Sequence, residues 1–247
     1  MQTAFQRATR HGVAVIAAAA LALTGAGVAV AAPDDTPGAG LRVADPGASA
    51  QTLSLFDYLA DSGRGGILFG QQHAVTESYS PATTGPDDES LRSDVYAGLS
   101  DLPAVFGFDT LALRGEEKPG VEGASSAENV ANLAAAFVRA DALGAIPTLS
   151  AHMPNFVTGG RYNDTEGRVV SQILPGGEKN ADYNAYLDLI AATAKSSERT
   201  DGTLVPIIFR PFHESNGSWF WWGAAHTSSG EIQEIFRYTV EYLRDVK

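Results

Sequence analysis

The feature that most constrains the fold is a short apolar run, followed at once by polar residues, that recurs four times between helical patterns. The four runs cover residues 67–70, 104–108, 146–150 and 204–209. Short apolar runs of this kind are typical of strands buried on both faces. Strands that alternate with helices form a parallel sheet with the helices packed outside it. Since polar residues follow the carboxyl end of each run, we expect an α/β fold, either a (β/α)₈ barrel or a doubly wound sheet.

Helical patterns and their punctuation separate the runs. Apolar residues at helical spacing predict a short helix within residues 53–60, which the glycines of segment 63–66 end. Ser125 and Glu128 form a capping-box signature that predicts the start of a second helix, and Gly144 is its expected stop.

Two further helices follow in the second half of the chain. Periodic apolar residues predict one over 183–194, and a second capping-box signature at Ser228 and Glu231 predicts another that runs to the end. Segments 81–88 and 156–175 are rich in turn-forming residues and are expected to be loops.

The number of units bears on which α/β fold this is. No G-x-G-x-x-G follows the first run and no P-loop is present, which disfavours a nucleotide-binding sheet. A complete (β/α)₈ barrel has eight units in about 250 residues, whereas residues 51–247 hold four. We therefore expect a TIM-barrel type domain of which only about the first four β/α units are present, a truncated barrel.

The charge and the cysteine content exclude several functions. The 247 residues carry a formal net charge of −12, which argues against nucleic acid and anionic membranes as partners. The chain has no cysteine, so disulfides, thiolate catalysis and cysteine-based zinc sites are excluded. We expect no cofactor, no metal site and a monomer.

The first residues are typical of a secretory signal. Arg7 and Arg10 precede an alanine-rich apolar stretch over 13–32, and Ala29-Val30-Ala31 fits a cleavage site. The interpretation is a signal peptide over 1–31, with a membrane anchor as the alternative. Residues 32–50 are rich in Pro, Gly, Ala and Asp and are expected to be a flexible linker before the domain at 51–247. A secreted, extracellular protein is expected, free of the membrane after signal cleavage.

The fourth run leads directly into the chain's most distinctive chemistry, segment 205–223. A carboxylic acid here follows a buried strand and precedes a group of flat aromatic rings, an arrangement suited to a sugar. Aromatic faces can stack on pyranose rings, while the carboxyl group can move a proton. The polar residues are Arg210, His213, Glu214 and Asn216, and the aromatic residues are Trp219, Phe220, Trp221 and Trp222.

Glu214 is the candidate catalytic residue. Glycoside hydrolysis uses two carboxyl groups, one of which protonates the leaving oxygen and needs a raised pKa, such as partly apolar aromatic surroundings supply. The alternative is a structural glutamate that pairs with Arg210. A zinc protease would need H-E-x-x-H, but Gly217 stands at the second histidine position. His213 is then expected to hydrogen-bond the acid or the substrate, or to be a buried core histidine.

The stretch RPFHE-x-NGSWFWWG resembles the acid/base segment of glycoside hydrolase family 26, which contains many secreted endo-β-1,4-mannanases. The resemblance extends over about residues 51–247. It implies a (β/α)₈ barrel, Glu214 as acid/base, and retention of configuration by double displacement. It also implies a nucleophilic glutamate on a seventh strand, which this chain does not include, so we expect little or no activity from the chain alone.

The resemblance also implies substrate-binding residues. His152 lies in Ser150-Ala151-His152-Met153-Pro154-Asn155, where Ala151 replaces the family's usual tryptophan. Gln71 stands where the family has a histidine after the first strand, and Asp109 is either polar lining or a cap. Trp222 is either a sugar-binding wall or packing at the barrel rim. The residues expected to bind substrate are His152, His213, Asn216, Trp219 and Trp222.

Three functional hypotheses remain at this point. The first is a secreted retaining glycoside hydrolase that cleaves internal β-1,4-mannosidic bonds of β-mannan or a related plant polysaccharide, with β-1,3-xylan or mixed-linkage β-glucan as alternative substrates. The second is a non-catalytic polysaccharide-binding protein. The third is an inactive truncated fragment.

Overall fold

The computed structural model describes residues 42–77, 84–85 and 88–246. These residues fall within one compact unit, which spans 37–247. The predicted signal peptide, the start of the predicted linker and part of the loop at 81–88 lie outside the described residues. Within the described part of the chain, no helix is both long and apolar enough to cross a membrane.

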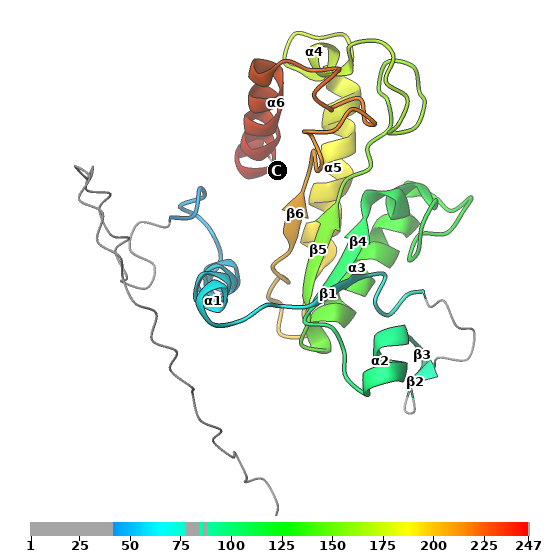
Figure 1. The fold of residues 1–247 in the computed structure, drawn as a ribbon, viewed down its shortest axis with the longest axis vertical. Coiled ribbons are helices and arrows are strands. Elements are labelled where there is room, and N and C mark those ends of the chain that lie inside the picture. The colour runs from blue at the N-terminus through cyan, green and yellow to red at the C-terminus, as the bar shows by residue number, and fades with distance from the viewer. Residues whose placement is uncertain (1–41, 78–83, 86–87, 247) are drawn as a thin grey trace, which may run out of the picture. The chain divides into compact units, whose positions relative to one another are not determined.

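The centre of the fold is a four-stranded parallel sheet in the order β1-β4-β5-β6 (Figure 1). Its strands are β1 (Gly70–Gln72), β4 (Val105–Asp109), β5 (Ile146–Ser150) and β6 (Ile208–Arg210). Because the spatial order follows the chain order, each strand lies beside the next one, as in a barrel. Asp109 is in register with Ser150, and Ser150 with Arg210, so three strand ends meet at one edge.

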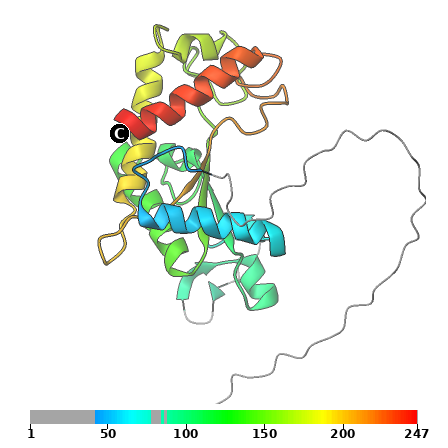
Figure 2. The same cartoon turned by 90° about the vertical axis from the view of Figure 1, so that its left-hand side faces the viewer.

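Helices connect the strands and cover the sheet. Figures 1 and 2 show α3 and α5 side by side against one face of the sheet. The helices are α1 (Ala50–Gly65), α2 (Asp94–Leu99), α3 (Ser126–Ala142), α4 (Val169–Ile173), α5 (Asn180–Ser196) and α6 (Ser229–Glu241). A 3-10 turn at Thr110–Arg114, a π turn at Tyr242–Val246 and a short antiparallel pair, β2 (Thr84–Gly85) with β3 (Asp88–Arg92), complete the described elements.

Both predicted capping boxes are confirmed. At the start of α3 the backbone N–H of Ser125 donates to Glu128 Oε2 at 2.8 Å, and the N–H of Glu128 donates to Ser125 Oγ at 3.2 Å. Ser228 and Glu231 repeat both bonds at 2.8 and 3.2 Å before α6. The reciprocal bonds satisfy N–H groups that a helix start otherwise leaves without partners, which is why this local sequence signature is reliable.

Two strand boundaries differ from the prediction. The first strand was expected at 67–70 but lies at Gly70–Gln72, and Ile67 is 96 % exposed. The fourth was expected at 204–209 but pairs with β5 only over Ile208–Arg210. Before that point the backbone N–H of Val205 donates to Ser197 O at 2.8 Å, and Pro206 has no N–H to give a neighbouring strand. Apolar composition alone did not show where pairing begins.

Four short elements were missed, namely β2, β3, α2 and α4. The β2–β3 pair and α2 lie around the segment expected to be a loop at 81–88, and α4 lies within the predicted loop at 156–175. Helices of five or six residues, such as α4 and α2, have too few turns for a periodic apolar pattern to emerge. α2 is nevertheless capped, since Ser93 Oγ accepts from the N–H of Tyr96 at 3.2 Å.

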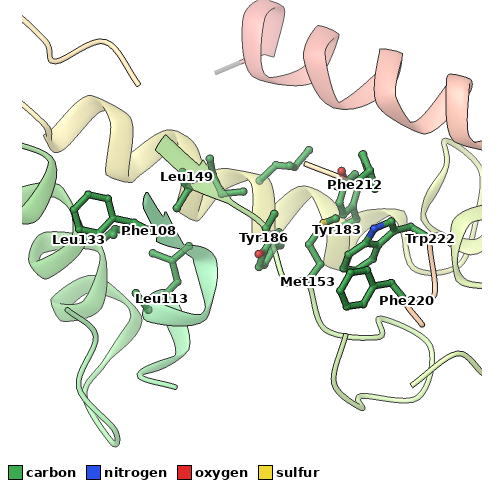
Figure 3. Close-up of a cluster of buried hydrophobic side chains, with 14 of the residues drawn as sticks. Phe108, Leu113, Leu133, Leu149, Met153, Tyr183, Tyr186, Phe212, Phe220 and Trp222 are labelled. Carbon is green, nitrogen blue, oxygen red and sulfur yellow. The ribbon is translucent and has the colours of Figure 1, made fainter. Parts of the chain in front are cut away.

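The core continues from the helices to the loops behind the strand ends (Figure 3). Phe108 of β4 packs edge-on against Phe137 of α3, with ring centroids 5.2 Å apart. Further along, Met153, Phe220 and Trp222 are buried together behind the end of β5. The loops that carry the candidate site therefore rest on a packed apolar base.

Candidate active site

Asp109 ends β4 and is the most highly connected side chain at the strand ends. It is 1 % exposed. Its Oδ1 accepts from the backbone N–H groups of Leu111 at 2.9 Å and His152 at 3.2 Å. Its Oδ2 accepts from Ser150 Oγ at 2.6 Å and lies 2.7 Å from His152 Nδ1. Asp109 is therefore a cap for the 3-10 turn and, at the same time, a link between the ends of β4 and β5.

These hydrogen bonds determine the charge of Asp109. Burial acts to raise the pKa of its carboxyl group, but the hydrogen bonds from His152 and Ser150 and the charge of His152 outweigh burial, so the pKa lies below its ordinary value of 3.8. The group is thus a carboxylate that only accepts. Consequently Nδ1 of His152 must carry a proton and donate it.

His152 lies two residues beyond β5, inside an aromatic enclosure. Its ring centroid is 4.5 Å from that of Tyr162 and 5.4 Å from that of Phe220. Its Nε2 lies 3.2 Å from Nε2 of His213, whose ring stands edge-on at 4.5 Å. The predicted site residues His152 and His213 therefore meet, although 61 positions separate them in the chain.

His213 follows β6 at a sharp bend. The residues on either side of it, Phe212 and Glu214, both have left-handed backbones, with φ of 53° and 55°. Such values are strained for non-glycine residues and turn the chain abruptly. His213 is 8 % exposed, and its pKa is lowered by burial first and then by the charges of His152 and Arg210, against the opposing charges of Asp109 and Glu214. His213 is therefore neutral near pH 7.

Glu214 presents its carboxyl group outward from the same bend. Its side chain is exposed, and its Oε2 accepts from Trp219 Nε1 at 2.8 Å. This bond replaces the ion pair with Arg210 that the sequence left open as an alternative. Of the expected aromatic surroundings, Trp219 is the residue that contacts the carboxyl group. Glu214 combines an accessible proton-transfer group with an aromatic neighbour that fixes its direction.

Trp219 and Asn216 flank Glu214 on the exposed side. Trp219 is 54 % exposed, so one face of its indole is available to a ligand. Gly217 makes room for it, because a Cβ at this position would clash with the Trp219 ring. Asn216 is also exposed. Both exposed residues belong to the same short segment as Glu214.

Trp222 differs from its predicted role. It is fully buried, its ring stacks on Phe220 with centroids 4.5 Å apart, and its Nε1 donates to His213 O at 2.8 Å. A buried indole offers no face to a sugar, so the direct substrate contact expected for Trp222 is corrected to packing, the alternative that the sequence left open. The residue holds the bend that carries His213 and Glu214.

Other segments singled out in the sequence organise the loops. Asn155 is fully buried, and its side chain bonds backbone groups of Val157, Thr158, Asp164 and Glu166. Gln71 of β1 is partly buried, and its Oε1 has no hydrogen-bond partner. Neither residue contacts Glu214 through a described hydrogen bond.

Sequence reasoning missed Tyr162 and Phe220 as the walls around His152. Tyr162 comes from the long loop after β5, and its ring also carries the guanidinium of Arg161, 5.5 Å from the centroid. Phe220 was noted among the aromatics but given no role. The adjacent aromatic residues after Glu214 were the available indication for Phe220, whereas nothing in the sequence distinguishes Tyr162.

Comparison with known proteins identifies the family to which this chain belongs. The sequence model of Glycosyl hydrolase family 26 matches residues 44–247, which is most of the chain. The chain belongs to glycosyl hydrolase family 26. Its match includes all four strands of the sheet and the whole of the segment that carries Glu214.

Named relatives agree with the family. A mannan endo-1,4-beta-mannosidase of Bifidobacterium adolescentis is 51 % identical over 211 residues, which is 85 % of this chain and 20 % of the relative. The endo-beta-1,4-mannanase of Cellulomonas fimi is a solved structure at 52 % identity with a TM-score of 0.76, covering 82 % of this chain and 44 % of that chain. The solved catalytic domain of the family 26 endo-beta-1,4-mannanase of Bacillus sp. JAMB-750 is 48 % identical with a TM-score of 0.80. The match covers 87 % of this chain and 55 % of that chain.

The similarity to solved structures confirms the predicted fold class and shows how much of a barrel this chain covers. The four-stranded parallel sheet with its helices is part of a (β/α)₈ barrel, as expected. The chain spans about a fifth of the length of the first curated relative and about half of the solved chains. It contributes a carboxylic acid, two linked imidazoles and an open indole to one end of that barrel.

Proposed function

We propose that this chain is the part of a retaining endo-β-1,4-mannanase that carries the general acid/base, Glu214. The single observation that carries the proposal is the placement of Glu214 at the bend after β6, exposed and hydrogen-bonded to Trp219 at 2.8 Å. The names of the relatives point to mannan as the substrate. In this role Glu214 protonates the glycosidic oxygen as the bond breaks and then takes a proton from the water that enters.

Trp219, Asn216 and His152 serve substrate binding in the proposal. The exposed indole of Trp219 stacks on a sugar ring, which places the glycosidic oxygen near the carboxyl group that the same residue orients. The exposed amide of Asn216 and the partly exposed ring of His152 offer polar groups to the sugar hydroxyls. His213 acts from below the surface, since it is 8 % exposed.

The nucleophile in this proposal is a glutamate on a strand other than β1, β4, β5 and β6. A retaining enzyme needs a second carboxyl group about 5–5.5 Å from the first. Asp109 does not meet this need, because it is buried and engaged by Ser150 and His152. Four further β/α units would supply the remaining side of the site.

The test is complementation with the other half of a related barrel. A chimera joins residues 42–247 to the carboxyl-terminal half of the Cellulomonas fimi mannanase, and release of reducing sugar from soluble galactomannan is measured. We expect the chain alone to be inactive and the chimera to be active. Replacement of a general acid costs about 10²- to 10⁴-fold in rate, so Glu214→Gln in the chimera should lose that much.

Two controls separate the alternatives. Glu198→Gln alters an exposed glutamate in the connection between α5 and β6, beyond the amino-terminal end of the sheet, and should leave the rate unchanged. Affinity electrophoresis in galactomannan should show that Glu214→Gln still binds. A Glu214→Gln chimera with undiminished rate would contradict the assignment, and binding without hydrolysis by the unaltered chimera would favour a polysaccharide-binding protein.

Secretion is also part of the proposal. Arg7 and Arg10, the apolar stretch at 13–32 and Ala29-Val30-Ala31 support removal of residues 1–31 on export. Expression in a secreting host and amino-terminal sequencing of the protein in the medium should give a mature chain that begins at Ala32. Retention of the full chain in the membrane fraction would favour the anchor instead.

A further inference from the structure

Between the buried carboxylate of Asp109 and the bend that carries Glu214 lies a continuous chain of hydrogen-bonding groups. Asp109 Oδ2 lies 2.7 Å from His152 Nδ1, and His152 Nε2 lies 3.2 Å from His213 Nε2. His213 is the residue immediately before Glu214, and its backbone carbonyl is held by Trp222 Nε1 at 2.8 Å. The side chains of Asp109, His152 and His213 thus connect the ends of β4 and β5 to the bend that carries Glu214.

The number of protons in this chain is restricted by what each group can do. Asp109 accepts hydrogen bonds from two backbone N–H groups and from Ser150, so its carboxylate donates nothing. Nδ1 of His152 therefore holds a proton. Two ring nitrogens 3.2 Å apart can share only one proton in a hydrogen bond, so either His152 or His213 donates between the two Nε2 atoms.

The far nitrogen of His213 decides which ring donates. His213 Nδ1 is buried and has no hydrogen-bond partner. A buried N–H without a partner is rarer in proteins than an acceptor without one. The unpartnered Nδ1 is therefore a bare lone pair, which puts the single proton of neutral His213 on Nε2. His213 then donates to Nε2 of His152, whose own proton is on Nδ1.

We propose that Asp109 is a positioning residue that fixes the tautomers of both histidines, with His152 protonated on Nδ1 and His213 on Nε2. The consequence for Glu214 rests on the function proposed above. Neutral His213, the residue next to Glu214 in the chain, brings no positive charge to this side of the site. A charged imidazole there would instead favour loss of the proton that Glu214 must deliver.

The lowered pKa of His213 supports this arrangement. Burial, the charge that His152 gains when it takes up a second proton, and the charge of Arg210 all disfavour the imidazolium of His213, and they outweigh Asp109 and Glu214, which favour it. These four groups are the charged or titratable groups that act on His213, and they come from the ends of β4, β5 and β6 together with the bend itself.

The substitution Asp109→Asn separates shape from protonation. An asparagine is close in size to aspartate, but its amide can donate to His152 Nδ1, which forces the proton of that ring to Nε2. In Ser-His-Asp triads the same change keeps the geometry and inverts the imidazole tautomer. Here the inversion would extend to His213. When Nε2 of His152 donates, Nε2 of His213 must accept, so the proton of His213 moves to its Nδ1.

The test is a long-range ¹⁵N–¹H correlation spectrum of the chain labelled with ¹⁵N-histidine, recorded above the ordinary histidine pKa of about 6.5. The expected wild-type spectrum shows protonated Nδ1 for His152 and protonated Nε2 for His213, and Asp109→Asn should exchange the protonated nitrogen in both rings. His226 is the internal reference, since its Nε2 lies 3.0 Å from Ser218 O and must stay protonated. Signals are assigned by His152→Gln and His213→Gln.

Ser150→Ala is the matched control. It removes one hydrogen bond from Asp109 Oδ2 but leaves the carboxylate as an acceptor, so both tautomers should remain as in the wild type. A wild-type spectrum with His213 protonated on Nδ1 would overturn the proposal even if Asp109→Asn failed to fold. Unchanged tautomers in folded Asp109→Asn would overturn it equally.

The catalytic consequence is read separately in the galactomannan-active chimera. Asp109→Asn should lower kcat on the order of 10²-fold with little change in KM, while Ser150→Ala changes neither. The tautomers are observed without substrate, so the spectrum tests the proton arrangement whether or not the proposed hydrolysis is found. If Asp109→Asn exchanges the tautomers but leaves kcat unaltered, the catalytic consequence of the positioning is contradicted and the proton arrangement stands.

Discussion

The ends of β4 and β6 each place a carboxylic acid at the same edge of the sheet, yet the two acids lie in opposite surroundings. Asp109 is 1 % exposed and receives hydrogen bonds from the backbone and from Ser150 and His152. Glu214 is exposed, and its carboxyl group accepts one described hydrogen bond, from Trp219. A fully bonded carboxylate can hold other groups in place, whereas an open one can exchange a proton with a ligand. The comparison makes Asp109 a supporting group and agrees with the catalytic role proposed for Glu214.

The same division separates the tryptophans around Glu214, and here the largest effect on stability is expected. Trp222 is fully buried against Phe220, whereas Trp219 is 54 % exposed. Trp222→Ala should lower the free energy of unfolding by about 3–5 kcal/mol. Trp219→Ala should change it by less than about 0.5 kcal/mol. Urea denaturation followed by circular dichroism measures both losses of stability, and equal losses would contradict the distinction between the buried, supporting indole and the exposed one.

Acid should remove the contribution of the buried Asp109 carboxylate to the stability of the fold. Because the folded-state pKa of Asp109 lies below its ordinary value of 3.8, its ionisation stabilises the fold above that pH, and the contribution is lost as pH falls through the folded-state pKa. Removing the carboxylate leaves buried donors without a partner, so Asp109→Ala should cost about 1–3 kcal/mol near pH 7.

The measurement is the unfolding free energy of wild type and Asp109→Ala between neutral pH and pH below 3.8. The difference between the two proteins should shrink as the pH falls through the lower part of this range. A difference that does not shrink as the pH falls would show that the ionised carboxylate of Asp109 does not stabilise the fold.

Sequence analysis predicted the local features of this fold well and the non-local ones poorly. The capping boxes at Ser125 and Ser228 are formed by residues three positions apart, so the sequence contains the whole interaction. The start of β6 depends on pairing with β5 and on the alternative bond from Val205 to Ser197 O, which apolar composition does not encode.

The candidate site divides in the same way. The residue order around Glu214 indicated the acid and its aromatic neighbour, because all of them lie within one segment. The link between Asp109 and His152 joins residues 43 positions apart, and it requires the strand register to be known. The burial of Trp222 likewise follows from the core beneath the bend and not from its position in the motif.

Ligand binding offers a smaller test of the open side of the site. Stacking of an aromatic ring contributes on the order of 1 kcal/mol, so Trp219→Ala should weaken galactomannan binding roughly fivefold. Affinity electrophoresis of the chimera in its Glu214→Gln form measures this without hydrolysis. Trp219→Phe should retain most of the binding, and a Trp219→Ala protein that binds as tightly as its parent would exclude Trp219 from the sugar contact.

The smallest expected effect concerns His73, which follows β1 and lies far from Glu214 in sequence. Burial acts to lower the pKa of His73, but the hydrogen bond and charge of Glu117, 2.9 Å away, outweigh it, so the pKa is raised above 6.5. A raised folded-state pKa stabilises the fold below pH 6.5, and this contribution is lost as pH rises through the raised value.

Glu117→Gln should therefore lower the pKa of His73, as measured by NMR titration, and cost less than about 1 kcal/mol of stability below pH 6.5. The difference in stability from wild type should fade as the pH rises above this point. Glu122→Gln is a matched control, since Glu122 is exposed in the same connection between β4 and α3. A His73 pKa that does not respond to Glu117→Gln would show that the ion pair is not formed.

The central claim, that Glu214 donates the proton to the leaving group, is tested most directly by changing how much the leaving group needs that proton. The galactomannan-active chimera and its Glu214→Ala variant are compared on galactomannan and on an aryl β-mannobioside whose acidic phenol leaves without protonation. The account predicts a loss of about 10²- to 10⁴-fold on galactomannan, while the first, stoichiometric release of phenol from the aryl substrate stays rapid because only the later hydrolysis step needs Glu214 as base. An equal slowing of galactomannan cleavage and of this first release, or no loss on either substrate, would contradict the account.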